Sequence, residues 1–78
     1  MESKITLDSE VLWISPNNKW SIEKINGYEL AISDGWEVCY AYISRDKSTL
    51  MVDRVIYPMY VQNKAIELAR SNIESIYK

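Results

Sequence analysis

Residues 28–44 read YELAISDGWEVCYAYIS, and this stretch decides the fold that the sequence predicts. It contains two strand-like runs that are rich in aromatic and other apolar residues, Tyr28–Ile32 and Trp36–Ser44. Between them stands Asp34-Gly35, a dipeptide that is typical of the tight turn between two antiparallel strands. The centre of the chain is therefore predicted to form an antiparallel β-hairpin.

Further strand-like runs and one helical segment surround this hairpin. The runs cover residues 11–14, 19–24 and 50–57, and a polar lead-in over residues 1–9 precedes them. The segments between the strands have turn-forming sequences, which are Ser15-Pro16-Asn17-Asn18, Asn26-Gly27 and Arg45-Asp46-Lys47-Ser48. Residues 10–57 are thus predicted to form one antiparallel sheet.

The C-terminal segment, residues 59–77, carries an apolar stripe at helical spacing. Pro58 suits a helix start, and Asn63 is a candidate N-cap if the helix begins later. The stripe consists of Val61, Ala65, Leu68, Ala69, Asn72, Ile73 and Ile76. The predicted fold class is therefore α+β: an antiparallel β-meander of four to five strands with one C-terminal helix packed on its aromatic face.

Loop lengths decide which side chains share a face of the sheet, because a shift of one residue turns a strand over. Three-residue loops at the two central turns and a four-residue loop at 15–18 gather the apolar residues on one face, whereas a two-residue turn at Asn26-Gly27 would divide them. A three-residue loop at 25–27, with a left-handed Gly27, places Ile22 opposite Leu30, and a three-residue loop at the next turn places Leu30 opposite Val38. The resulting apolar face contains Val11, Trp13, Trp20, Ile22, Tyr28, Leu30, Ile32, Trp36, Val38, Tyr40 and Tyr42.

The last predicted strand fits this pattern less well. Pairing Tyr42 with Leu50 keeps the apolar face continuous, but it places the charged Arg54 opposite Val38. We expect Arg54 to lie near a sheet edge with its guanidinium in water, and a polar contact with a partner is the alternative.

Composition limits the classes of protein to consider. The chain has 78 residues, of which 47% are hydrophobic and 26% charged, with a net charge of −2. This length predicts a single domain over residues 1–78, and the apolar content is too high for a disordered chain. The single cysteine excludes an internal disulfide. No apolar run has the length of a membrane span, and the N-terminus lacks the apolar stretch of a signal peptide, so we expect a cytoplasmic protein without a membrane partner.

The sequence offers few groups for catalysis. Without histidine, His-dependent triads and the commonest general base at neutral pH are missing. Cys39 falls in the middle of a predicted strand, where a thiol is usually an inert core residue, and one cysteine cannot form a zinc site alone. Both glycines lie in turns, which leaves no phosphate-binding loop. We therefore expect no enzymatic activity, no cofactor and no metal.

The second face of the predicted sheet carries a candidate partner-binding surface. Glu23 falls directly opposite Glu29, a like-charge pair, and further carboxylates lie on the same face. An acidic zone beside apolar anchors suits a basic partner, whereas an ordinary solvated face is the alternative. The candidate residues are Glu23, Glu29, Glu37 and Asp53 with Met51 and Tyr57, flanked by Arg45 and Lys47.

These observations predict a small non-enzymatic protein-binding module that modulates or inhibits a larger protein. Small stand-alone domains of this kind include regulators and inhibitors encoded by phages or mobile elements, and a nucleic-acid-handling host complex would offer a basic surface. The first alternative is single-stranded nucleic-acid binding through exposed sheet aromatics and the loop of Arg45 and Lys47. The acidic balance argues against nucleic acid as a direct partner. The second alternative is a structural homo-oligomeric subunit, such as a homodimer.

Overall fold

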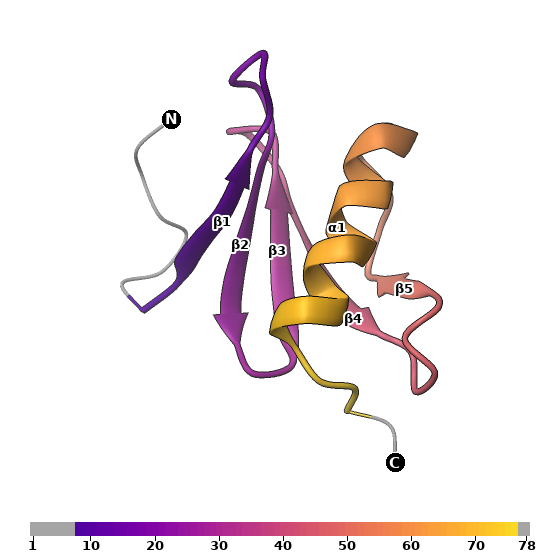
Figure 1. Cartoon of the computed structure of the whole chain (residues 1–78). Helices are drawn as coiled ribbons and strands as arrows, with labels where there is room; N and C mark the ends of the chain where they lie inside the picture. The colour runs from indigo at the N-terminus through magenta and orange to yellow at the C-terminus, as the bar shows by residue number, and fades with distance from the viewer. Residues whose placement is uncertain (1–7, 77–78) are drawn as a thin grey trace.

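The chain folds into one sheet followed by one helix. The computed structural model describes residues 8–76, which form a five-stranded antiparallel sheet in the order β1-β2-β3-β4-β5 and a C-terminal helix, α1 (Figure 1). The predicted α+β meander is confirmed, while residues 1–7 of the predicted lead-in and Tyr77 lie outside the described residues. The elements are β1 (Glu10–Ile14), β2 (Ser21–Asn26), β3 (Glu29–Ser33), β4 (Val38–Ile43), β5 (Leu50–Val52) and α1 (Met59–Asn72).

The hairpin of β2 and β3 is shifted by two residues from the predicted register. Ile22 lies opposite Ile32 instead of Leu30, because a two-residue turn at 27–28 and an extra residue in β2, Ile25, replace the predicted three-residue loop at 25–27. A shift of two residues keeps every side chain on its face, so all three of these apolar residues are buried as predicted. The prediction of a left-handed Gly27 is wrong, since its φ is not positive.

Strand β4 is turned over relative to the prediction. Ile32 lies opposite Cys39, because a four-residue loop over residues 34–37 replaces the predicted three-residue loop. This odd shift exchanges the two faces of β4. Cys39, Ala41 and Ile43 are fully buried in the core beneath the helix. The opposite side of the sheet, which we call the helix-free face, contains Ser21, Glu23, Ala31, Ser33, Val38, Tyr40, Tyr42 and Met51.

Packing against α1 explains the orientation of β4. Cys39 and Ala41 are small, and the helix contributes the small side chains Ala65 and Ala69 to the same buried cluster. Small groups on both elements let a helix approach a sheet closely, whereas two tyrosines at these positions would hold it away. The prediction assigned the aromatic residues in and beside β3 and β4 to the core face. It was wrong for five residues, which are Tyr28, Trp36, Val38, Tyr40 and Tyr42.

An irregularity in β1 changes the face of Val11. Trp13 lies opposite Ile22, whereas Val11 lies opposite Glu23, because the register shifts between Val11 and Trp13. Such a bulge inserts one extra residue, here Leu12, into the strand. Val11 therefore lies on the helix-free side and is 37% exposed, although it was predicted to be in the core. Trp13 is half-buried and packs against the core.

The last strand is shorter than predicted because a side chain ends it. The Asp53 carboxylate accepts a hydrogen bond from the Tyr40 amide at 2.9 Å, and the Asp53 amide donates to the Tyr40 carbonyl at 3.2 Å. A carboxylate thus stands where a continuing strand would offer its next carbonyl. The predicted pairing of Tyr42 with Leu50 is wrong by one residue, because Ile43 lies opposite Leu50. Arg54 lies beyond the end of β5 and is exposed, and its guanidinium donates to the Val38 carbonyl at 2.9 Å.

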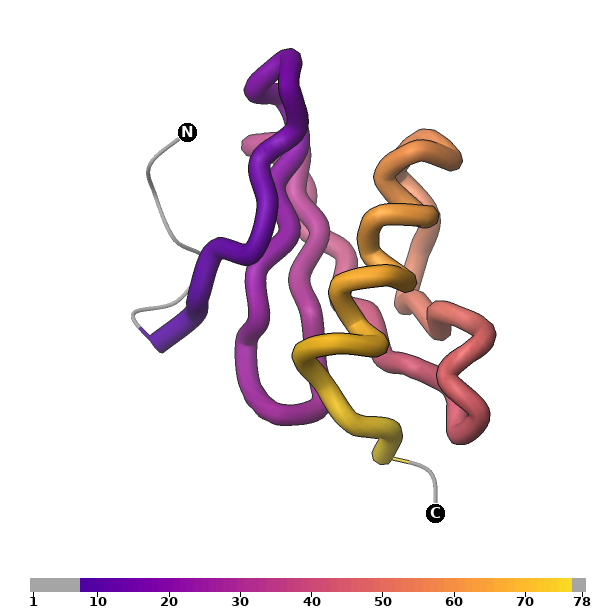
Figure 2. The backbone as a smooth tube through the Cα atoms, in the orientation of Figure 1, coloured from indigo at the N-terminus to yellow at the C-terminus, as the bar shows by residue number. Residues whose placement is uncertain are grey.

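Helix α1 covers the part of the sheet formed by β3, β4 and β5 (Figures 1 and 2). It begins after Pro58, as predicted, and ends at Asn72, earlier than predicted. Ile73 is extended and buried, and the next amide, of Glu74, donates to the Gly27 carbonyl at 2.8 Å. The chain leaves the helix early because these contacts attach it to the β2–β3 turn.

The loop between β1 and β2 is organised by one buried serine. The Ser15 amide donates to the Trp20 carbonyl at 2.8 Å, and Ser15 Oγ accepts from the amides of Lys19 and Trp20 at 3.2 and 2.9 Å. Asn17 Oδ1 accepts from the Lys19 amide at 3.1 Å, and Asn18 has a left-handed backbone with φ of 62°. Side chains therefore satisfy the amides that this turn leaves without a backbone partner.

The loop between β4 and β5 repeats these bonds at corresponding positions. The Ser44 amide donates to the Thr49 carbonyl at 2.9 Å, and Ser44 Oγ accepts from the amides of Ser48 and Thr49 at 3.2 and 3.0 Å. Asp46 Oδ1 accepts from the Ser48 amide at 3.0 Å, and Lys47 has φ of 62°. The two loops share one hydrogen-bond pattern although their sequences differ.

Candidate functional site

The carboxylate of Glu23, predicted to face a partner, is buried within the molecule. Only 1% of the residue is exposed, and Ser9 Oγ donates to Glu23 Oε1 at 2.7 Å. Glu23 lies opposite Ala31, so the predicted like-charge pair with Glu29 does not form. The prediction of Glu23 as a docking residue is wrong, because a buried hydrogen-bonded carboxylate cannot contact a partner without opening the fold.

Two other predicted carboxylates are bound to neighbouring groups. Glu29 accepts hydrogen bonds from the Tyr42 hydroxyl at 2.8 Å and from the Asn26 amide group at 3.3 Å. Asp53 accepts from the backbone amide of Tyr40, as described above. Both side chains therefore have structural roles on the sheet, although both keep contact with solvent.

The two predicted apolar anchors lie in different environments. Tyr57 is only 8% exposed and belongs to the core, where burial raises the pKa of its hydroxyl. Its placement on the docking surface is wrong, because β5 ends at Val52 and strand alternation does not extend to it. Met51 is 40% exposed on the helix-free face, so it remains accessible to a partner.

The remaining predicted residues lie at the two ends of β4. Glu37 precedes the strand, and the exposed Arg45 and Lys47 follow it. Eight residues of extended chain span about 26 Å, so Glu37 and Arg45 lie at opposite ends of β4. The eight predicted residues therefore do not form one continuous surface.

The exposed residue that sequence reasoning missed is Trp36. It lies in the β3–β4 loop and is 93% exposed, although it was predicted to be in the core. The other tryptophans differ sharply, since Trp20 is 5% exposed and Trp13 is half-buried. Indole side chains presented in this way are enriched among the anchors of protein–protein interfaces.

The loop that presents Trp36 is held by the carboxylate of Asp34. Asp34 Oδ1 accepts from the amides of Trp36 and Glu37, both at 2.9 Å, and these backbone donors lower the pKa of Asp34. Gly35 supplies the left-handed conformation that the turn requires, with φ of 94°, and its amide donates to Ser33 Oγ at 3.0 Å. The backbone on both sides of Trp36 is therefore fixed before any partner arrives.

Three segments meet at the end of the molecule that carries Trp36. The β3–β4 loop, the β1–β2 loop and the first turn of α1 all lie at this end (Figure 1). The ammonium group of Lys19 lies 5.7 Å from the centre of the Trp20 ring, and its charge helps to lower the pKa of Asp34. Met59 and Tyr60 of the helix are 66% and 48% exposed. This end therefore combines exposed aromatic and apolar groups with charges of both signs.

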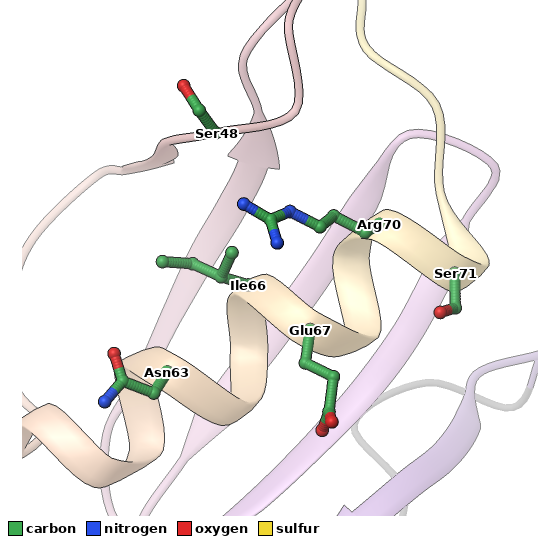
Figure 3. Close-up of a pocket in the computed structure, with 6 residues that line it drawn as sticks. All are labelled: Ser48, Asn63, Ile66, Glu67, Arg70 and Ser71. Carbon is green, nitrogen blue, oxygen red and sulfur yellow. The ribbon is translucent and has the colours of Figure 1, made fainter.

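Two shallow grooves border helix α1. One groove, of about 450 Å³, lies beside the β4–β5 loop, and Arg70 donates from Nε to the Lys47 carbonyl at 2.7 Å there. Figure 3 shows the Arg70 guanidinium near Ser48 and Ile66, with Glu67 pointing away from it. The other, which we call the β1–α1 groove, has about 440 Å³ and is lined by Trp13, Pro16, Tyr60, Asn63, Lys64 and Glu67.

The described residues provide little for metal or covalent chemistry. Residues 8–76 contain no group of three or more carboxylate, thiol or imidazole side chains placed to hold a metal ion. Cys39 is fully buried, and burial raises the pKa of its thiol to about 11. Within the same residues, no helix has the length and apolar character needed to cross a membrane.

No family model matches this chain. Searches of curated proteins and of solved structures also found no match. The function must therefore be inferred from the geometry and chemistry of the molecule, and Trp36 is its most exposed large apolar side chain among the described residues.

Proposed function

We propose that this chain is a non-enzymatic protein-binding module that docks onto a larger protein through Trp36 and modulates it. The observation that carries the proposal is an indole that is 93% exposed on a loop fixed by Asp34. An aromatic anchor with few rotatable bonds loses little entropy on binding, and a fixed backbone reduces that loss further. Burial of such a side chain in a partner's pocket can supply a large share of the binding energy.

The neighbouring charges support a partner with a basic rim around its pocket. Glu37 follows Trp36 directly and is exposed, and no hydrogen bond or ion pair involves its carboxylate in the described part of the chain. Lys19 lies close enough to Asp34 to affect its pKa, so the local charge is mixed. A partner cation facing Glu37 would favour association and would make binding weaker at high salt.

Affinity capture with the full chain tests this proposal. Wild-type protein and two variants, Trp36→Ala and Tyr28→Ala, are immobilised and exposed to lysate of the source cell with and without nuclease treatment. Tyr28 is the matched control, because it is also an exposed aromatic residue, at 52%, but it precedes β3 whereas Trp36 follows it. We expect one protein to be retained by wild type and by Tyr28→Ala and lost with Trp36→Ala.

Three outcomes would overturn the proposal. Retention of the same protein by Trp36→Ala would show that the indole is not the anchor. Binding that disappears on nuclease treatment would favour the nucleic-acid alternative, and self-association without any captured protein would favour the homo-oligomer. A Glu37→Lys variant then tests the charge, and weaker retention than wild type is expected.

A further inference from the structure

The β1–α1 groove exists because one helix is too narrow to cover five strands. Helix α1 packs on β3, β4 and β5, which leaves the inner side of β1 beside a gap. Trp13 of β1 and Pro16 of the next loop form one wall of this gap, and Tyr60 of the helix forms part of the other. Two aromatic rings and a proline ring thus line a groove that is open to solvent.

Within the part of the chain that the structure describes, three hydrogen-bond donors on this groove have no protein acceptor. The indole N–H of Trp13, the hydroxyl of Tyr60 and the side-chain amide of Asn63 make no hydrogen bond within residues 8–76. Tyr60, Asn63 and Glu67 are spaced three and four residues apart, so they lie along one side of α1. A ligand with apolar surface and regularly spaced acceptors would satisfy these donors while it contacts the rings.

We infer that the β1–α1 groove binds a proline-rich segment of another protein in the polyproline II conformation. Such a segment has flat apolar pyrrolidine rings and backbone carbonyls without internal hydrogen bonds, and it docks in aromatic-lined grooves. The side of α1 from Tyr60 to Glu67 extends about 10 Å. One turn of polyproline II, three residues long, rises about 9 Å. The groove therefore matches a single turn, with one proline near each end.

The charge on the groove fits this occupant. Its two ionic side chains neutralise one another, since Lys64 Nζ lies 2.8 Å from Glu67 Oε2. An uncharged proline-rich segment needs no counter-charge, whereas a strongly acidic or basic peptide would face no net opposite charge here. The extended, preformed ligand also loses little entropy on binding. This inference does not depend on the proposed function of Trp36.

Calorimetric titration of the full chain with a decaproline peptide tests the inference. We expect saturable binding below about 1 mM, and Tyr60→Ala should weaken it at least about tenfold because it removes an aromatic wall. Tyr28→Ala is the matched control, since Tyr28 is similarly exposed but does not line the groove, and it should bind decaproline as wild type does. Trp36→Ala should also bind normally, and it leaves Trp13 of the groove and the buried Trp20 as the remaining sources of tryptophan fluorescence.

Peptide controls separate polyproline recognition from other modes of binding. A glycine–serine decapeptide should not bind, and an alternating threonine–valine decapeptide tests the addition of an extended strand to the β1 edge. The inference is overturned if decaproline fails to bind up to about 1 mM, if the strand-forming peptide binds as well, or if Tyr60→Ala and Tyr28→Ala weaken binding equally. Sedimentation of the free chain shows whether a second copy occupies the groove, and a stable dimer that excludes decaproline would also overturn it.

Discussion

The β1–β2 and β4–β5 loops adopt the same hydrogen-bonded structure from different residues. Each begins with a serine, Ser15 or Ser44, whose hydroxyl oxygen accepts hydrogen bonds from two backbone amides. Two residues later, a side-chain oxygen of Asn17 or Asp46 accepts another. The loops differ at the left-handed position, which is Asn18 in one and Lys47 in the other. They also differ in burial, since Ser15 is 3% exposed and Ser44 is half-buried.

The comparison shows which residues determine the loop. The serine and the side-chain oxygen are shared, so they are the groups that the hydrogen-bond pattern requires. The charge of Asp46 is not required, because the neutral Asn17 accepts the corresponding bond. Lysine is also not required at the left-handed position, where asparagine is better tolerated. Each difference leads to a measurement on the pair of loops.

The largest expected effect comes from removing the buried serine. Ser15→Ala leaves the buried amide of Trp20 without its side-chain acceptor, whereas the exposed Lys19 amide keeps Asn17 Oδ1, and we expect the free energy of unfolding to fall by about 1–3 kcal/mol. Ser44→Ala should lower it by only about 0.5–1 kcal/mol, because water can reach the corresponding amides. Urea denaturation of both variants measures the difference. Equal losses would contradict the role assigned to burial.

Exchanging the residues at the two left-handed positions should change the stability in opposite directions in the two loops. Lys47→Asn should raise the free energy of unfolding by about 0.5–1 kcal/mol, because asparagine adopts positive φ more readily than lysine does. Asn18→Lys should lower it by a similar amount, for the same reason. Thermal denaturation of the two variants and the double exchange provides the test. If neither single change shifts the midpoint, the backbone at these positions is not strained.

The smallest expected effect is on pH dependence. The Ser48 hydroxyl, then the Ser44 hydroxyl and the Ser48 amide, lower the pKa of Asp46 from 3.8 to about 2. Because the pKa is lowered on folding, the ionised carboxylate stabilises the fold at pH values above its unfolded pKa near 4. This contribution is lost as the pH falls toward 2. In Asp46→Asn, which copies Asn17, the stability should change less between pH 5 and pH 2. Identical pH profiles for variant and wild type would contradict this role.

The meander and the C-terminal helix were predictable because turn residues and apolar periodicity mark them directly. The face of β4 was not, since Val38–Ile43 is apolar at every position and alternation therefore carries no information. Only the length of the preceding loop decides this face, and that length depends on how Asp34 caps the amides of Trp36 and Glu37. A single residue of loop length thus decides whether Tyr40 or Cys39 is in the core.

The candidate site was harder to predict than the fold. Glu23 has the residue type of an exposed strand position, and its burial depends on a contact with Ser9, fourteen residues away. Trp36 has the residue type of a core position, and its exposure depends on the loop. A usable signal was present in Asp34, because aspartate before a glycine commonly caps the amides that follow it. The β1–α1 groove depends on where the helix crosses the sheet, and no local pattern in Trp13 or Tyr60 indicates this.

The position of Cys39 makes its thiol a probe of how often the protein opens locally. The thiol is sealed between the sheet and α1, and its high pKa keeps it protonated. A thiol reagent can therefore react only during the intervals in which the helix has lifted from β4. Because the sequence contains no other cysteine, the labelling rate reports on this opening alone. The measurement needs no substitution in the chain and no denaturant.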